Sequence, residues 1–420
     1  MTGVVHVVGA GLSGLSAAVR LAEAGRTVMV HEAAGHAGGR CRSYHDPHLG
    51  MTIDNGNHLV LSGNGATFAF LDRIDGRNAV VVHPRAEFPF VDFAAGERWT
   101  LRLNQGRVPW WMLDPSRRVP GTKATDYAAI LRLLSARPGA KVSDVLCCEG
   151  TLYERLWRPV LLAALNIDPR DADATLAAQV LRETFGEGGH ACRPVVAGGG
   201  LSQAFVDPAL RFLEERGAVV RHTERLHRLA YEGGRVVGLV LGDGSVRLRP
   251  RDQVILALPP KATADAVPGL EVPTDHRGIA NVHFGVNCPA DMPRLTGVVN
   301  GLSDWIFAYP DRISVTVGAT DLGDLSRAEL ARRIWTEVSY VTGWYMTGLS
   351  DMPPTWQVIR EKRATFAPTP EGARLRPRTR TEFRNLFIAG DWTDTGLPAC
   401  IEGAIRSGDK AARTAMEVSG

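Results

Sequence analysis

The chain opens with apolar runs that are separated by a glycine-rich turn. Residues 4–8 are mostly valine, a pattern that predicts a short strand buried in a parallel sheet. Alanine and leucine then recur at helical spacing over 15–24, and Gly25 follows where this helix is expected to end. Residues 27–30 predict a second strand, with Glu32 at its end. This order of elements is typical of a Rossmann dinucleotide-binding unit.

The turn places Gly9, Gly11 and Gly14 at the spacing G-x-G-x-x-G. Gly9 allows a tight turn, Gly11 lets a pyrophosphate approach the backbone, and Gly14 lets the helix pack closely on the strand. The helix N-terminus favours phosphates, and Glu32 is placed to accept hydrogen bonds from ribose hydroxyls. The stretch predicts a dinucleotide site whose carboxylate disfavours NADP, but by itself it does not distinguish NAD from FAD.

The rest of the hydrophobic pattern predicts further helices and strands in separate blocks. Residues 77–111 and 274–317 are rich in strand-forming residues. Helices are expected at 127–134, 151–165 (kinked by Pro159), 201–216 and 327–342, and strands at 219–220, 236–241, 246–248, 254–258 and 385–389. The run 254–258 has the pattern of a buried parallel strand, so the chain is expected to return to its first domain there.

The predicted fold class is therefore α/β. A Rossmann-type cofactor domain is expected to be assembled from three segments, residues 1–75, 194–265 and 376–420. Two insertions, residues 76–193 and 266–375, are expected to form an α+β substrate domain with a mixed or antiparallel sheet and helices.

The composition is that of an ordinary globular protein of 420 residues, with 45% hydrophobic and 22% charged residues. The formal net charge of +3 is too small to predict nucleic-acid binding. The six cysteines form no C-x-x-C pair and show no zinc-like spacing with histidines, so we expect reduced thiols, no metal site and a cytoplasmic protein. We expect no signal peptide, and no stretch approaches the roughly 18 apolar residues of a spanning helix. The protein is expected to be soluble or to lie on a membrane without crossing it.

Two further glycine-containing segments supply candidate cofactor contacts. Gly38 and Gly39 bring backbone close to a ligand, and Arg40 supplies a cation for a phosphate. Near the end of the chain a predicted strand is followed by Gly390 and Asp391. The glycine permits close approach and the aspartate can bind a sugar-alcohol hydroxyl. The N-terminus of the next helix can face an electron-rich flavin oxygen.

Residues 53–61 insert polar residues and a glycine into an apolar strand. This pattern suggests backbone that lies against something flat or bulky. Alternatively, Asp54 and His58 satisfy local backbone groups.

Residues 108–113 form an apolar patch that contains Trp110 and Trp111 and is followed by Arg117 and Arg118. Aromatic residues beside cations suit a membrane interface. They equally suit a lid packed over an apolar pocket.

Taken together, these motifs resemble those of the squalene-associated FAD-dependent desaturase family, within the FAD-dependent amine oxidase and phytoene desaturase superfamily. Its characterised members are hydroxysqualene dehydroxylases of hopanoid pathways. The resemblance covers nearly the whole chain and is carried by the motifs at 9–14, 38–40, 54–58, 157–166 and 389–404. Two departures are visible, since Asn57 stands where the family usually has Gln and Cys400 where it usually has Thr. Both replacements are polar or small, so they do not threaten cofactor binding.

The resemblance implies FAD as the cofactor, because NAD dehydrogenases lack the second glycine motif. It also implies that the strand around Leu226 contacts the adenine and that residues 54–58 run beside the flavin ring. The candidate cofactor residues are Gly9, Gly11, Leu12, Ser13, Gly14, Glu32, Gly38, Gly39, Arg40, Asn55, Gly56, Leu226, Gly390, Asp391, Cys400 and Ile401. Candidate substrate contacts are Trp157, Asn166 and Trp305.

The implied reaction is the reductive removal of the hydroxyl of hydroxysqualene, which yields squalene. An allylic alcohol loses water when its oxygen is protonated, and a hydride from reduced flavin then quenches the cation. His58 is the candidate acid, Asp54 its candidate orienting partner, and Asn57 a third candidate catalytic residue. The alternatives are a carotenoid-type desaturase and an isoprenoid carrier without catalysis.

The chain has one dinucleotide turn, so we expect an external electron donor rather than a second nucleotide domain. Because a thirty-carbon isoprenoid is confined to lipid, we also expect peripheral binding to the inner face of the cytoplasmic membrane.

Overall fold

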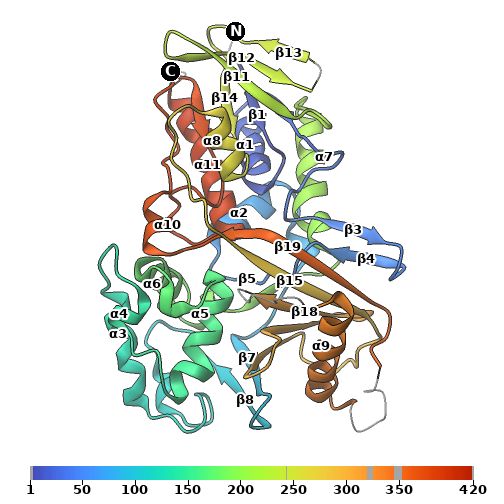
Figure 1. Ribbon diagram of the computed structural model, residues 1–420, viewed down its shortest axis with the longest axis vertical. Helices are drawn as coiled ribbons and strands as arrows, with labels where there is room; N and C mark the ends of the chain where they lie inside the picture. Colours follow the sequence, from blue (N-terminus) through green and yellow to red (C-terminus); the bar gives the residue numbers. More distant parts are fainter. Residues whose placement is uncertain (1–2, 243, 319–324, 345–351, 419–420) are drawn as a thin grey trace.

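The computed structural model describes residues 3–242, 244–318, 325–344 and 352–418. The molecule is elongated and has two lobes (Figure 1). One, the parallel-sheet lobe, holds a parallel sheet with its helices. The other, the mixed-sheet lobe, holds a large mixed sheet and a group of short helices. The first strand and the last helix both lie in the parallel-sheet lobe.

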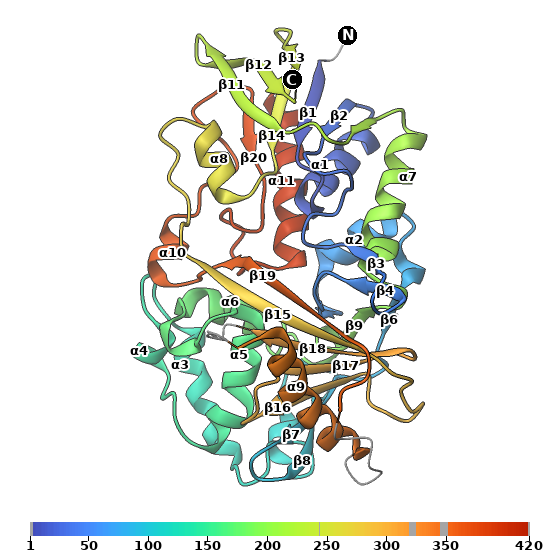
Figure 2. The ribbon, with the colours of Figure 1, turned by 45° about the vertical axis from the view of Figure 1, so that its right-hand side comes forward.

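Five parallel strands form the centre of the parallel-sheet lobe, in the order β10-β2-β1-β14-β20. Their bounds are Val4–Val8 (β1), Thr27–His31 (β2), Val219–Arg221 (β10), Gln253–Leu256 (β14) and Leu386–Ile388 (β20). β14 and β20 are buried along their whole length, which explains why their sequences are mostly apolar without alternation. Strands that are adjacent in this sheet thus come from distant parts of the sequence (Figure 2).

Helices surround this sheet. They are α1 (Leu12–Glu23), α2 (Gly65–Arg73), α7 (Asp207–Glu215), α8 (Pro260–Ala266) and α11 (Ile401–Val418). α1 and α11 approach each other closely at Gly408. A Cβ added to this glycine would lie 2.1 Å from the carbonyl oxygen of Ser13. The two helices therefore meet backbone to backbone.

Three small antiparallel sheets extend the parallel-sheet lobe. They consist of β11 (Leu226–Glu232), β12 (Arg235–Leu241) and β13 (Gly244–Arg247); of β3 (Ser43–Asp46) and β4 (Met51–Asp54); and of β5 (Val60–Leu61), β9 (Pro194–Ala197) and β6 (Val80–Val82).

The mixed-sheet lobe is built on seven strands in the order β19-β15-β18-β17-β16-β7-β8. Their bounds are Glu87–Asp92 (β7), Glu97–Arg102 (β8), His276–Gly285 (β15), Leu295–Val299 (β16), Trp305–Ala308 (β17), Arg312–Gly318 (β18) and Trp356–Phe366 (β19). All neighbours are antiparallel except β16 and β7. The helix α9 (Arg327–Thr342) packs on this sheet through buried residues such as Leu330, Ile334 and Val338.

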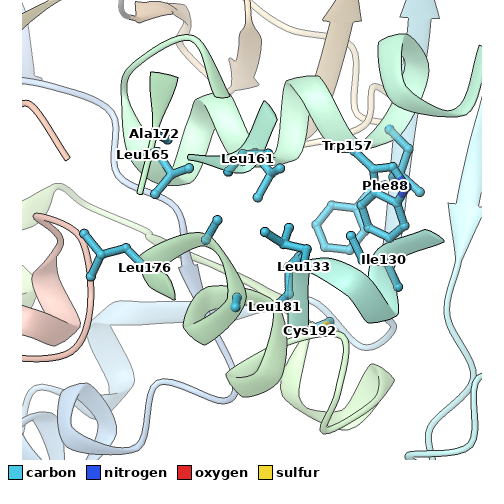
Figure 3. Packing of buried hydrophobic residues seen from close by; sticks show 14 of the residues in the cluster. Phe88, Ile130, Leu133, Trp157, Leu161, Leu165, Ala172, Leu176, Leu181 and Cys192 are labelled. Carbon is cyan, nitrogen blue, oxygen red and sulfur yellow. The ribbon is translucent and has the colours of Figure 1, made fainter. Parts of the chain in front are cut away.

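Short helices form the other part of the mixed-sheet lobe. They are α3 (Ile130–Leu134), α4 (Val142–Val145), α5 (Arg158–Leu165) and α6 (Ala174–Glu183), with α10 (Pro370–Arg374) nearby. Their apolar faces enclose one core with residues of β7 and β8, and Figure 3 shows Leu133, Trp157 and Leu161 within it. This shared core packs the short helices together, although none of them exceeds ten residues.

The structure differs from the sequence-based expectation in several local features. The first helix begins at Leu12 rather than at residue 15. The helices expected at 151–165 and 201–216 each contain a π-helical turn, at Tyr153–Trp157 and Ser202–Val206. In both cases a proline follows within two residues, and its missing N–H removes a regular i→i−4 hydrogen bond. The expected helix at 127–134 is α-helical only from Ile130, after a 3₁₀ segment.

The expected strand over residues 53–61 is also interrupted. β4 ends at Asp54 and β5 begins at Val60, so the polar residues between them form a loop. The α/β class, with a Rossmann sheet and a mixed second sheet, is confirmed. Within the described ranges, no helix is long and apolar enough to span a bilayer.

Gly408 provides a test of the close helix contact. In an exposed helix interior, Gly→Ala stabilises by up to about 1 kcal/mol. Here we expect Gly408→Ala to destabilise the protein by about 1–3 kcal/mol through overpacking, as a lower thermal unfolding midpoint. Gly65→Ala is the control, because no atom lies within 4 Å of the position that its Cβ would occupy. A Gly408→Ala protein as stable as the parent would contradict the contact.

Candidate functional site

The glycine turn between β1 and α1 combines two tightly packed glycines with one open glycine. Gly9 has a φ of +104°, and a Cβ on Gly14 would lie 1.9 Å from the Gly9 carbonyl oxygen. Around Gly11, in contrast, no atom lies within 4 Å of a Cβ position. Gly11 forms a parallel bridge with Gly38, so the two glycine segments expected to contact the cofactor lie side by side. Of these glycines only Gly11 is open, since a Cβ on Gly38 would lie 2.7 Å from the carbonyl oxygen of Cys41.

The carboxylate of Glu32 is tied to this turn. It accepts hydrogen bonds from the N–H of Ala10 at 2.7 Å and from the N–H of Ala34 at 2.8 Å. The backbone carbonyl of Glu32 accepts from the N–H of Glu224, which brings the segment leading to Leu226 alongside. Glu32, which is expected to bind the ribose, and the strand at Leu226, which is expected to contact the adenine, are therefore neighbours.

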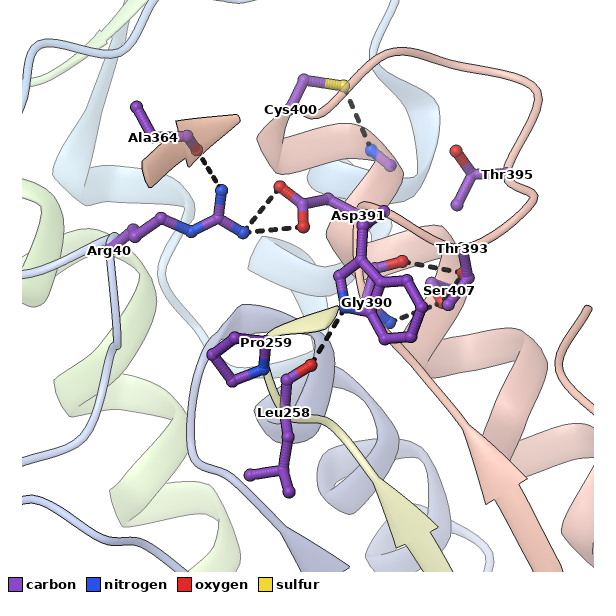
Figure 4. Close-up of polar contacts among 12 residues, drawn as sticks. Arg40, Leu258, Pro259, Ala364, Gly390, Asp391, Thr393, Thr395, Cys400 and Ser407 are labelled. Atoms are coloured by element: carbon purple, nitrogen blue, oxygen red, sulfur yellow. Dashed lines mark hydrogen bonds and ion pairs between the residues drawn. The ribbon is translucent and has the colours of Figure 1, made fainter. Parts of the chain in front are cut away.

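Arg40 and Asp391 lie 351 positions apart in the sequence and bind each other (Figure 4). One terminal nitrogen of Arg40 donates to both carboxylate oxygens at 2.7 Å, and the other donates to the carbonyl of Ala364. Asp391 raises the pKa of Arg40, whereas burial lowers it. Yet 45% of the Arg40 side chain is accessible, so it can still contact a ligand. From the sequence, Arg40 was expected to bind a phosphate and Asp391 a sugar-alcohol hydroxyl. Their hydrogen bonds to each other were not predicted.

Close packing and side-chain capping shape the segment after β20. A Cβ on Gly390 would lie 2.4 Å from the indole nitrogen of Trp392, which donates to the carbonyl of Leu258. Cys400 Sγ accepts a hydrogen bond from the N–H of Gly403 at 3.3 Å, as a hydroxyl would at this helix start. Burial raises the pKa of this thiol to about 12, so it remains neutral. α11 begins at the next residue, Ile401, and points its N-terminus toward this segment.

Asp54 and His58 do not form the expected hydrogen-bonded pair. Oδ1 of Asp54 accepts from the hydroxyl of Ser43 at 2.6 Å and from the N–H of Leu201 at 2.8 Å. No hydrogen bond of His58 is found among the described residues. Burial lowers the pKa of His58, as does Arg40, while Asp54 raises it. The ring is therefore mainly neutral at pH 7, and Asp54 serves to hold the Ser43 and Leu201 segments together.

Asn57 is anchored to the mixed sheet. Its side-chain amide donates to Asn281 Oδ1 at 3.2 Å and to Thr316 Oγ1 at 3.1 Å, and its N–H also donates to Asn281. Sequence reasoning missed both partners. The only signal for Asn281 was a polar residue within a run of buried apolar ones on β15.

Two of the three candidate substrate residues, Trp157 and Trp305, are buried in the same apolar core, and Trp305 lies edge-on to Phe90 at 5.5 Å between ring centres. Asn166 ends α5 in the left-handed conformation, with φ of 52°. Its amide donates to Thr365 Oγ1 at 2.9 Å, next to the residue whose carbonyl binds Arg40. The structure thus brings Asn166 toward the Arg40–Asp391 pair.

The architecture of the whole chain matches that of known flavoproteins. The profile of the flavin containing amine oxidoreductase family matches residues 12–416. The chain belongs to this family. The hydroxysqualene dehydroxylase of Rhodopseudomonas palustris is 49% identical over 414 residues, 98% of each chain. That of Zymomonas mobilis is 44% identical over 99% of this chain and 100% of its own. Cyclohexylamine oxidase from Brevibacterium oxydans has the same fold, with a TM-score of 0.73 at 16% identity over 100% of both chains.

The protein is an FAD-dependent oxidoreductase, and its residues fit that cofactor. The open backbone at Gly11 leaves room for a pyrophosphate beside the amides at the start of α1. Glu32 retains acceptor capacity beyond its two backbone bonds, and 45% of the Arg40 side chain is accessible. Figure 4 shows the guanidinium of Arg40 against the carboxylate of Asp391, with Cys400 near them.

Proposed function

We propose that the protein catalyses the reductive dehydroxylation of hydroxysqualene to squalene. The supporting observation is its 44–49% identity, over nearly the full length of both chains, with proteins named hydroxysqualene dehydroxylase. A desaturase and a carrier remain as outcomes of the test below.

The cofactor is held by the parallel-sheet lobe, which we assign to residues 1–75, 194–265 and 376–420. Its adenosine half is bound by the glycine turn, Glu32 and the strand at Leu226. The backbone of Leu12, Ser13 and Gly39 completes the phosphate site, with Arg40 as its cation. Asn55, Gly56, Asp391, Cys400 and Ile401 supply the flavin end. Residues 76–193 and 266–375 bind the substrate.

FAD, when bound and reduced, supplies the hydride for this reaction. The protein must protonate the departing hydroxyl, exclude water and orient the chain of the substrate. Asn57 positions the loop of residues 55–59 through Asn281 and Thr316. His58, mainly neutral, provides a polar hydrogen-bonding group on the same loop rather than a strong acid. An external donor, such as a reductase, a reduced flavin or a quinol, returns the electrons to the cofactor.

The apolar patch at residues 108–113 is proposed to contact the lipid surface, with one correction. Trp110 is 49% exposed and Leu113 is 71% exposed, whereas Trp111 is 2% exposed and packs edge-on against Tyr127. Trp111 therefore belongs to the core. The guanidinium of Arg117 lies 4.6 Å from the centre of the Trp110 ring. A cavity of about 540 Å³ opens beside this segment, next to Arg118.

An anaerobic single-turnover experiment tests the reaction. Enzyme with chemically reduced FAD is mixed with hydroxysqualene, and we expect squalene to form in a one-to-one ratio with oxidised flavin. Squalene without flavin oxidation, or no conversion, would contradict the proposal. Conversion of a saturated isoprenoid segment by the oxidised enzyme would instead indicate a desaturase.

The double variant Trp110→Ser with Leu113→Ser tests the lipid contact. We expect reduced co-sedimentation with liposomes that contain anionic lipid, because about 2 kcal/mol or more of apolar burial is lost per side chain. FAD content is expected to be unchanged. Val219→Ser is the control, since Val219 is 44% exposed but lies in the other lobe. Equal sedimentation of the double variant and the parent would favour the lid interpretation.

A further inference from the structure

Two buried histidines connect the first two strands of the parallel sheet to the segment that precedes Leu226. His6 lies on β1 and His31 on β2, and they are 3% and 1% exposed. Nδ1 of His6 lies 3.0 Å from Nε2 of His31, and Nδ1 of His31 lies 2.6 Å from a carboxylate oxygen of Glu224. The other oxygen of Glu224 accepts a hydrogen bond from Arg221 at 3.3 Å. We call this chain of three side chains the His6–His31–Glu224 network.

The charges of the groups fix the direction of each hydrogen bond. Burial lowers the pKa of His6 to about 4, as do the charges of His31 and Arg221, whereas Asp252 raises it. Burial also lowers the pKa of His31, and this effect exceeds the opposite effect of Glu224. Both rings are therefore mainly neutral at pH 7. Although burial raises the pKa of Glu224, its bonds to His31 and Arg221 lower it on balance, so this group is a carboxylate.

The two imidazoles consequently have defined tautomers. A carboxylate only accepts hydrogen bonds, so Nδ1 of His31 carries a proton and donates to Glu224. A neutral imidazole has one N–H, which leaves Nε2 of His31 as an acceptor for the Nδ1–H of His6. The network thus assigns the Nδ1–H tautomer to both histidines.

The backbone next to Glu224 is bound to the strand end that carries Glu32. The N–H of Glu32 donates to the carbonyl of Arg221, and the N–H of Glu224 donates to the carbonyl of Glu32, both at 2.8 Å. The N–H of Thr223 donates to the carbonyl of Ala34 at 3.1 Å, and the N–H of Ala34 donates to the Glu32 carboxylate. Backbone and side-chain bonds therefore hold residues 221–224 against the same short segment.

Thr223 has a backbone conformation that this attachment must maintain. Its φ is 60°, in the left-handed region that a β-branched residue rarely adopts. Such a conformation persists only where the surrounding contacts enforce it, and it is most frequent at ligand sites. The next residue, Glu224, is fixed by His31 through its side chain and by Glu32 through its N–H. β11 begins two residues later, at Leu226.

His31 also contacts the glycine turn. Its carbonyl accepts a hydrogen bond from the N–H of Gly9 at 2.7 Å. One residue thus connects the turn, through its backbone, to the segment before Leu226, through its side chain. His6 and His31 are too deeply buried to contact a ligand themselves.

We propose that the His6–His31–Glu224 network positions residues 223–226 to receive the adenosine half of FAD. The three side chains are positioning residues, since they act through the backbone that leads to Leu226. This proposal rests on the cofactor site assigned under the proposed function, in which Glu32 binds the ribose and the strand at Leu226 contacts the adenine.

Binding of FAD and of ADP to the apoprotein tests the proposal with Glu224→Ala. We expect both ligands to bind about 10-fold more weakly than to the parent, because the segment loses the bond that fixes it to the sheet. Glu224→Gln retains an acceptor for His31 and is expected to recover most of the affinity. Glu215→Ala is the control, because Glu215 is a 73% exposed carboxylate at the end of α7 in the same lobe.

Nitrogen NMR of histidine-labelled protein provides a readout that does not depend on ligand affinity. In the parent at pH 7 we expect the Nδ1–H tautomer for both His6 and His31. In Glu224→Ala, we expect His31 to lose this fixed tautomer, whereas Glu215→Ala is expected to keep the parent spectrum.

Each opposing result has a defined meaning. Equal affinity of Glu224→Ala and the parent for FAD, or a loss for FAD that ADP does not share, would overturn the role of the network. The Nε2–H tautomer of His31 in the parent would overturn it as well. Failure of the parent apoprotein to bind ADP would overturn the assigned adenosine site. Squalene formation is measured separately, so its failure in the parent would overturn the proposed reaction and leave the network's role standing.

Discussion

The proposed cofactor site depends on the direct contact of backbone with backbone around α1. Gly14 places the helix against the carbonyl of Gly9, and Gly408 lets α11 approach the carbonyl of Ser13. No side chain separates these segments, so the N-terminus of α1, the glycine turn and the last helix are held in one arrangement. Glu32 reinforces it through the N–H of Ala10. The open backbone at Gly11 is useful to a phosphate only because its neighbours are packed this tightly.

Local features of this arrangement could be predicted from the sequence, whereas long-range partnerships could not. The strand, turn and helix around Gly9 depend on residues within about thirty positions, and so does the placement of Glu32. The bond between Arg40 and Asp391 spans 351 positions, and that between Asn57 and Thr316 spans 259. Residue type showed that each group was suited to a ligand, but only the fold shows that two such groups first bind each other.

The same limit applies to His58, the candidate acid. His58 stood out in the sequence because a histidine in a glycine-containing polar segment is a familiar acid, yet burial lowers its pKa. Likewise, the buried position of Trp111 follows from its contact with Tyr127, which periodicity does not show. The environment of a side chain, rather than its type, decides these roles.

In the proposed function, the glycine turn, held by the carboxylate of Glu32, binds FAD. Titration of apoprotein with FAD, followed by flavin fluorescence, tests it with Glu32→Ala. We expect FAD affinity to fall about 10- to 100-fold, because a carboxylate that orders the turn and accepts ribose hydrogen bonds is lost. Glu23→Ala removes a surface carboxylate that pairs with Arg20 at the end of α1, and it is expected to leave the FAD affinity unchanged. Equal affinity of Glu32→Ala and the parent would contradict the account.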